Sequence, residues 1–163
     1  MKILKLLLAV SPPAFLVFSL ITVAQAGLTR DQLTRDPCIG QPNGIRLVVR
    51  DVRSSDGDIT VDVHGDNPDS FLKKGAKLMR VREPARVGQV EVCLPVREPG
   101  VFAVVAYHDR NSNKRFDRDW VGIPEEPYGI SNNPEVLFAA PTHEEASFEV
   151  GPDGAVIEID LRH

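Results

Sequence analysis

Seven short runs of apolar residues constrain the fold of this chain more than any other feature of its sequence. They cover residues 45–52, 59–63, 77–82, 87–94, 101–107, 146–150 and 155–161. Most of them alternate apolar with polar side chains and are rich in Val and Ile, which is the pattern of β-strands. No long amphipathic helix pattern interrupts them. The sequence therefore predicts an all-β fold, a single antiparallel β-sandwich of about seven strands.

Turn signals and one long gap separate these runs. A turn at residues 54–57 predicts a β-hairpin between the first two runs, and Asn67-Pro68 predicts one or two helical turns. The last two runs are predicted as a further pair of strands joined across residues 151–154. Residues 108–145 contain no convincing strand, but apolar side chains recur along them. We therefore expect one long ordered loop there.

The N-terminus has the pattern of a secretory signal. Lys2 and Lys5 precede an apolar run over residues 6–23, and Ala24 and Ala26 are the small residues that a signal peptidase reads. We predict a signal peptide over residues 1–26 with cleavage after Ala26, then an N-terminal lead over residues 27–43 and the sandwich domain over residues 44–163. An uncleaved anchor is the alternative, because an apolar run of this length just spans a bilayer. Cleavage predicts a periplasmic or secreted protein with no membrane attachment.

Cys38 and Cys93 are the only cysteines in the chain. An even number of cysteines in an exported protein favours pairing, because its compartment is oxidising. We therefore predict a structural disulfide between them. In the fourth apolar run Val90, Val92 and Leu94 share one face, so Cys93 is expected on the opposite face, outside the core.

An Asp/Asn-rich segment after the fifth run holds the best candidate site. It matches positions 1, 3, 5, 7 and 9 of a calcium-binding loop pattern, where alternate residues turn inward around a hard cation. The predicted calcium ligands are Asp109, Asn111, Asn113, Arg115 through its backbone carbonyl, and Asp117. Two positions depart from the pattern, because Lys114 replaces the usual glycine and Trp120 the usual glutamate. Asp119, Glu125 or Glu126 could complete such a site.

The alternative for the same segment is a loop that caps its own backbone. Asp and Asn side chains accept hydrogen bonds from backbone N–H groups two residues ahead, as Asx-turns. The sequence leaves both interpretations open. Calcium is the cofactor that we expect if the loop binds one.

Catalysis has little support in the sequence, so we expect a non-catalytic protein that presents the loop to a protein or glycan partner. A mildly acidic balance, with a formal net charge of −4, argues against nucleic acid. One alternative function is a small metal-dependent hydrolase that uses His108, Asp109 and His143. Another is a carbohydrate-binding module that stacks sugars on loop aromatics. Its candidate residues are Trp120, Tyr128 and Phe138.

Several of these segments together carry a family resemblance. They are Pro99-Gly100, the strand ending at Tyr107, the segment from His108 to Asp117, Gly122-Ile123-Pro124-x-Glu126 and Gly129-Ile130-Ser131-Asn132-Asn133. In this order and chemistry they resemble the DUF2141 family of exported bacterial proteins, over about residues 44–161. The chain departs from the family pattern at Phe102, Lys114 and Ile130. The resemblance implies an exported β-sandwich related to transthyretin-like and carboxypeptidase-regulatory-like modules, and implies no activity. We therefore expect a sandwich of transthyretin-like or immunoglobulin-like architecture.

Overall fold

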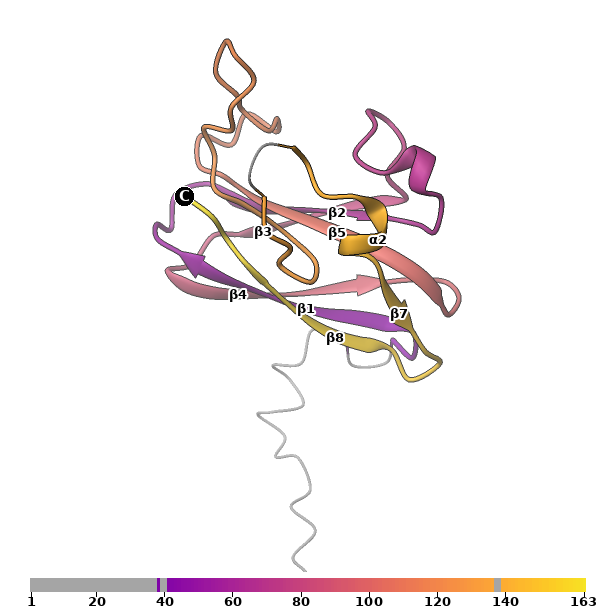
Figure 1. Cartoon of the computed structure of the whole chain (residues 1–163). Helices are drawn as coiled ribbons and strands as arrows, with labels where there is room; N and C mark the ends of the chain where they lie inside the picture. The colour runs from indigo at the N-terminus through magenta and orange to yellow at the C-terminus, as the bar shows by residue number, and fades with distance from the viewer. Residues whose placement is uncertain (1–37, 39–40, 137–138) are drawn as a thin grey trace, which may run out of the picture.

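The computed structural model describes residues 38, 41–136 and 139–163 (Figure 1). The predicted signal peptide, the cleavage site after Ala26, most of the predicted lead and Phe138 lie outside the described residues. The strands are β1 (Gly44–Val52), β2 (Asp58–His64), β3 (Met79–Pro84), β4 (Gly88–Pro95), β5 (Gly100–Asp109), β6 (Tyr128–Ile130), β7 (Phe148–Val150) and β8 (Ala155–Asp160). A 3₁₀-helix, η1 (Pro68–Ser70), and one helical turn, α2 (His143–Ala146), complete them. No helix in the described part is long and apolar enough to cross a membrane.

These strands form two facing sheets (Figure 1). One sheet has the order β4-β1-β8, and the other has the order β3-β2-β5-β6, with β7 also paired to β5. The predicted all-β sandwich is confirmed. Its described strands number eight, because β6 lies within the predicted long loop. One pair, β1 with β8, is parallel, while the other pairs are antiparallel.

The predicted hairpin between the first two runs is wrong. β1 pairs with β4 and β8, whereas β2 pairs with β3 and β5, so residues 53–57 carry the chain from one sheet to the other. Gly57 permits this crossing, because its φ of 69° is left-handed and an added Cβ would collide with the carbonyl oxygen of Asp109 on β5. The predicted pairing of the last two runs with each other is also wrong, because β7 pairs with β5 and β8 pairs with β1. Ala146 belongs to α2 rather than to a strand, since Thr142 and Glu145 form a capping box that starts this turn.

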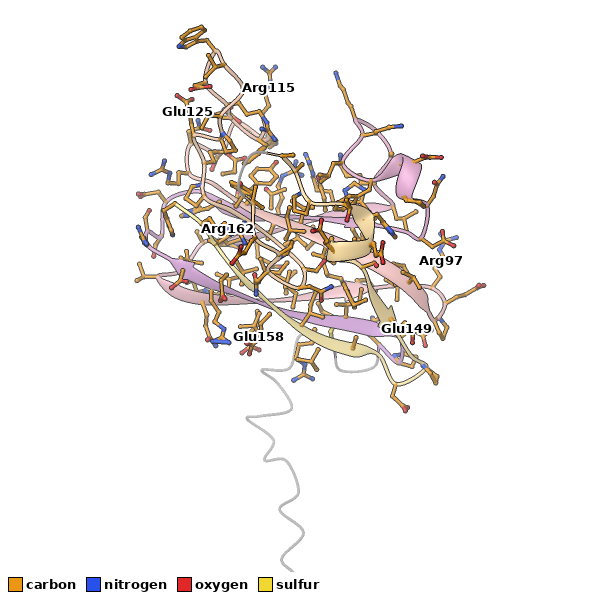
Figure 2. The ribbon with its side chains drawn as sticks, in the orientation of Figure 1. Arg97, Arg115, Glu125, Glu149, Glu158 and Arg162 are labelled. Carbon is orange, nitrogen blue, oxygen red and sulfur yellow. A yellow bond between two sulfur atoms is a disulfide. The ribbon has the colours of Figure 1, made fainter. Side chains whose placement is uncertain are left out.

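β5 connects the core to the candidate site. Its alternate residues Phe102, Val104 and Ala106 are buried in the main core, as the continuous apolar run predicts. The chain then leaves the sheet as a loop that projects beyond the sandwich, and Figure 2 shows Arg115 and Glu125 on this projection.

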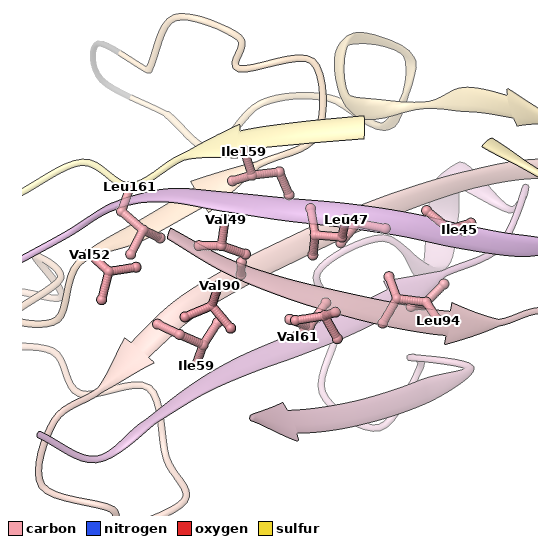
Figure 3. Packing of buried hydrophobic residues seen from close by; sticks show 14 of the residues in the cluster. Ile45, Leu47, Val49, Val52, Ile59, Val61, Val90, Leu94, Ile159 and Leu161 are labelled. Carbon is pink, nitrogen blue, oxygen red and sulfur yellow. The ribbon is translucent and has the colours of Figure 1, made fainter. Parts of the chain in front are cut away.

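Alternation along the strands builds the core between the sheets (Figure 3). Ile45, Leu47 and Val49 of β1 point inward and are fully buried. Asp51 has a φ of 58° at a register shift in the β1–β4 ladder, and this extra residue turns Val52 inward as well. Further core side chains come from the facing strands. They include Ile59, Val61, Val63, Val90, Val92, Leu94 and Ile159.

A disulfide joins Cys38 to Cys93, with the two Cα atoms 5.1 Å apart. Cys93 is half-buried, whereas Val92 and Leu94 beside it on β4 are fully buried. The predicted pairing is therefore present, and Cys93 faces away from the core as the alternation predicts. The bond ties the chain just before β1 to the neighbouring strand β4.

Candidate functional site

The Asp/Asn-rich segment forms a tight turn organised by the carboxylate of Asp109. This side chain is fully buried, and its Oδ1 and Oδ2 accept hydrogen bonds from the backbone N–H groups of Asn113 (3.0 Å) and Lys114 (2.8 Å). Asn111 Oδ1 accepts from the N–H of Asn113 (3.0 Å), and Asn113 Oδ1 from that of Arg115 (2.8 Å). These are the Asx-turns of the self-capping interpretation.

Asp117 closes the turn from the other side. Its Oδ2 accepts hydrogen bonds from the amides of Asn111 (2.8 Å) and Asn113 (2.7 Å). The structure thus brings all five predicted calcium ligands onto one turn, Arg115 included. The self-capping hydrogen bonds are present, and the oxygens of Asp109, Asn111 and Asn113 that accept one of them each keep a second lone pair. Calcium binding stays a prediction.

Lys114 adopts the conformation that glycine supplies in calcium-binding loops. Its φ is 67°, in the left-handed region, and Ser112 two residues earlier has a φ of 54°. A lysine there is strained, because its Cβ crowds the backbone in this region. Lys114 therefore replaces the glycine of the calcium-loop pattern without removing the sharp turn that the glycine normally forms.

Glu126 is the acidic residue that the fold adds to this turn. Its side chain is only 5% exposed, its Oε2 accepts a hydrogen bond from the N–H of Asp117 (3.1 Å), and its Oε1 is buried with no partner among the described residues. Burial raises the pKa of Glu126, and the charges of Asp109 and Asp117 raise it further, against the lowering effect of the backbone N–H groups of Asp117 and Arg110. The Arg110 N–H lies near this carboxylate without making a hydrogen bond of good geometry to Oε1. No three His, Cys, Asp or Glu side chains of the described part group closely enough to hold a metal. A cation here would also need the amide oxygens of Asn111 and Asn113.

The loop projects an apolar tip, residues 118–124, that its own hydrogen bonds hold together. Asp119 Oδ1 accepts hydrogen bonds from the N–H groups of Val121 (3.0 Å) and Ile123 (2.8 Å), and a β-bridge joins Arg118 to Pro124. Trp120 stands at this tip with 95% of its surface exposed, next to Val121 at 55% and Ile123 at 61%. A monomeric protein rarely leaves neighbouring large apolar side chains in water without a use.

The two histidines of the hydrolase alternative lie far apart. His108 is buried, and its Nε2 lies 2.7 Å from the carbonyl oxygen of Asp56. His143 starts α2, and its Nε2 lies 2.8 Å from the carbonyl oxygen of Gly65. His108 pairs with Ile59 near one end of β2, whereas Gly65 follows the other end, about 20 Å away along the strand. The fold does not bring these histidines together.

The aromatic residues of the carbohydrate alternative also separate. Tyr128 packs edge-on against Phe116, with 5.7 Å between ring centroids, and Phe116 packs in turn against Tyr107 at 5.2 Å. Trp120 is at the exposed tip and makes none of these ring contacts. Trp120 and Tyr128 therefore do not form a shared stacking platform.

A family model described as an uncharacterized protein conserved in bacteria (DUF2141) matches residues 47–158. The chain belongs to the DUF2141 family. Neither a curated protein nor a solved structure matches it. The matched residues include the turn around Asp109, the tip and the strands that carry them, so the DUF2141 domain is the sandwich together with its loop.

Two asparagines of the DUF2141 segment after β6 have a structural role. Asn132 and Asn133 adopt left-handed φ values of 65° and 48°. Asn132 Nδ2 donates to the carbonyl oxygens of Glu145 (3.1 Å) and Ser147 (2.8 Å), while Asn133 Oδ1 accepts from the N–H of Asp160 (2.9 Å). This segment therefore joins β6 to α2 and to β8, on the other sheet.

Sequence reasoning missed a groove of about 730 Å³ on the outer face of the β3-β2-β5-β6 sheet. Its lining comes from β2, β3, β5, β6, the loop and the connection from η1 to β3, which lie far apart in the DUF2141 sequence. The local signal that could have indicated it is the lysine-rich stretch over residues 73–77.

Proposed function

We propose that this DUF2141 protein is an exported, non-catalytic binding protein that docks a protein partner through the tip over residues 118–124. The observation that carries the proposal is the exposure of Trp120, Val121 and Ile123 on a hydrogen-bonded hairpin. Tryptophan is enriched among residues that dominate binding free energy at protein interfaces. Because the tip is already ordered, binding loses little conformational entropy there.

The charges around the tip indicate the chemistry of the partner. Arg115 and Arg118 are exposed beside the apolar residues, and Arg118 also lies over the ring of Phe116, 4.7 Å from its centroid. Positive side chains at the edge of an apolar patch steer partners with a complementary negative edge. We infer a partner with an apolar pocket for Trp120 and acidic side chains around it.

Export is supported by the N-terminal pattern and by the disulfide. A disulfide between Cys38 and Cys93 is typical of oxidising compartments such as the periplasm or the cell exterior. Both features favour a partner in the cell envelope or outside the cell.

Photo-cross-linking tests the docking proposal. The photoreactive residue p-benzoylphenylalanine replaces Ile123, and the protein is illuminated in an envelope extract of the source bacterium. We expect an adduct of defined mass that excess wild-type protein suppresses and excess Trp120→Ala protein does not, because the tryptophan carries the contact.

The matched control carries the same photoreactive residue at Val156, which is 71% exposed on β8. The same adduct from both positions, or equal competition by Trp120→Ala protein, would contradict docking through the tip. If the wild-type protein instead binds lipid vesicles and Trp120→Ala abolishes this binding, the tip binds a membrane surface. That result would also contradict docking of a protein partner.

We also propose that calcium binds the turn. The acids Asp109, Asp117 and Glu126 do not group closely enough to hold a metal as they lie, so the ion would draw Glu126 toward the five predicted ligands. Two observations favour the ion. Lys114 has the left-handed φ of a calcium-loop turn, and Glu126 Oε1 is buried without a partner in the described part, near Asp109 and Asp117. A divalent cation would neutralise carboxylates that otherwise repel one another.

Thermal unfolding with EDTA and with millimolar calcium tests this second proposal. At a calcium concentration tenfold above Kd, the free energy of unfolding should rise by about 1.4 kcal/mol, because only the folded state binds. Glu126→Gln should lose this response, whereas the exposed neighbour Glu125→Gln should keep it. An unchanged unfolding midpoint in the wild type would leave the turn as a self-capped loop.

A further inference from the structure

The groove on the outer face of the β3-β2-β5-β6 sheet has an apolar floor. Val105 and Tyr107 of β5 line it, alternating along the strand with core residues on the opposite face. Phe116 and Tyr128 line it as well, and their rings pack together in one aromatic cluster with Tyr107. A surface of this kind binds hydrocarbon or flat aromatic groups.

Cationic side chains surround this floor. Five of them line the groove: Lys73, Lys74, Lys77, Arg80 and Arg118. The acidic residue among the lining is Asp62, whose carboxylate contacts Arg80 through two hydrogen bonds of 2.5 Å and lies 3.6 Å from the Lys77 Nζ. The positive excess is local, because the chain as a whole has a formal net charge of −4. Such a groove concentrates anions.

Two lining residues carry buried polar atoms that make no hydrogen bond of good geometry in the described part, Nδ1 of His64 and the hydroxyl of Tyr107. The Tyr107 hydroxyl has the Thr60 hydroxyl beside it as a hydrogen-bonding neighbour, so Nδ1 of His64 is the atom of the two that lacks a nearby partner. Burial lowers the pKa of His64 and raises the pKa of Tyr107, so both side chains are neutral near pH 7 and keep an N–H or O–H donor. Unsatisfied buried polar atoms are rare in native folds, so the unpaired Nδ1 of His64 in the wall points to a polar group that binds there.

We propose that this groove binds an organic anion with an apolar body. The acidic group, a carboxylate or a phosphate, lies among the lysines at the edge, and the body packs on Val105 and the aromatic cluster. The volume of about 730 Å³ is typical of small-molecule sites. This ligand site adjoins the partner-docking tip, because Arg118, Val121 and Ile123 of the tip also line the groove. It lies apart from the calcium turn, because none of the predicted calcium ligands lines the groove.

Isothermal titration of the full mature protein with short amphiphiles tests the proposal. The probes are decanoate and decyl phosphate. Decanol and decylamine are controls that keep the hydrocarbon chain but lack the negative charge, and inorganic phosphate is a control that keeps the negative charge but lacks the chain. We expect the two anionic amphiphiles to bind at least about tenfold more tightly than any control, because only they use both the apolar floor and the cations. The ratio of decanoate to decyl phosphate affinity separates a carboxylate source from a phosphate source.

Charge-matched variants localise the binding. Lys73→Gln, Lys74→Gln and Lys77→Gln combined should weaken both anions roughly tenfold, since each lysine contributes a modest electrostatic attraction. The control combines Arg53→Gln, Arg86→Gln and Arg97→Gln, which remove the same charge from exposed positions outside the groove. It should change the affinity less than about twofold.

Several results would overturn the proposal. Decanol that binds as tightly as decanoate means a purely apolar surface, and inorganic phosphate that binds as tightly as decyl phosphate means a simple anion surface. An equal loss of affinity for the anions in the lysine and arginine variants would also reject binding in the groove. So would the absence of binding by both anionic amphiphiles. Binding of the whole protein to phosphatidylglycerol vesicles without binding of the free anions would assign the cations to a membrane surface instead.

Discussion

The carboxylate of Asp109 holds the backbone of Lys114 in a left-handed turn. Oδ2 of Asp109 accepts the hydrogen bond of the Lys114 N–H at 2.8 Å, and Lys114 has a φ of 67°. A conformation that disfavours a residue with a Cβ is therefore stabilised by a buried acid five positions earlier. The first and sixth positions of the calcium-loop pattern depend on one another in this fold.

Replacing Asp109 by Ala should destabilise the protein in EDTA by about 3 kcal/mol, because two hydrogen bonds from backbone N–H groups to a charged acceptor are lost. Urea unfolding measures this loss. Asp119→Ala is the matched control, since Asp119 Oδ1 also accepts two N–H groups but Asp119 is only half-buried, and its loss should cost about 1 kcal/mol. Equal losses at both positions would show that Asp109 is no more important than a tip cap.

Lys114→Gly should raise the free energy of unfolding by about 0.5 kcal/mol. Glycine relieves the strain of the left-handed conformation, although it also increases the entropy of the unfolded chain. Arg115→Gly is the control, because Arg115 is not among the residues with positive φ and should lose stability. Urea unfolding of both variants decides the matter, and a loss at Lys114 as large as that at Arg115 would argue against strain.

Alternation along the chain was sufficient to predict the layers of the fold, but not all of the strand pairing. Residues 45–52 and 59–63 have the correct period, and their buried faces follow from it. Their pairing in separate sheets depends on the approach of Gly57 to Asp109, a contact across about 50 positions. β6 was missed because Tyr128, Gly129 and Ile130 become a strand only by pairing with β5.

The candidate turn was predictable because its contacts are local. Asp109, Asn111, Asn113 and Asp117 lie within nine positions, so their spacing already contains the Asx-turn geometry. The groove was not predictable, because Lys77 and Tyr128 come together only through the order of strands in one sheet. Local spacing carries no information on such distant pairs.

The stability of the protein in EDTA should depend on pH through Glu126. Burial raises the folded-state pKa of this carboxyl above its ordinary value of 4.5. The protonated form is therefore favoured in the folded state, so the stability due to this group is present below pH 4.5 and is lost as the pH rises through the raised pKa. The free energy of unfolding of Glu126→Gln relative to the wild type should then increase with pH.

Urea unfolding from pH 4 to pH 7, as an approximate range around the raised pKa, measures this difference. Glu125→Gln is the control, because the Glu125 side chain is exposed and its removal should shift the curve by a constant amount. If the Glu126→Gln and wild-type curves run parallel across this range, Glu126 does not titrate differently in the folded state.

Gly129→Ala should separate the two sheets where β6 lies against β8. An added Cβ at Gly129 would collide with the Ile159 side chain and would lie 2.6 Å from the carbonyl oxygen of Asp160. Backbone cannot move away cheaply there, because Tyr128 and Arg162 exchange two backbone hydrogen bonds of 3.1 and 2.8 Å. We expect a loss of at least about 2 kcal/mol by urea unfolding. Gly151→Ala meets no atom within 4 Å and should change stability by less than about 0.5 kcal/mol, so similar losses would mean that chain entropy rather than close packing requires these glycines.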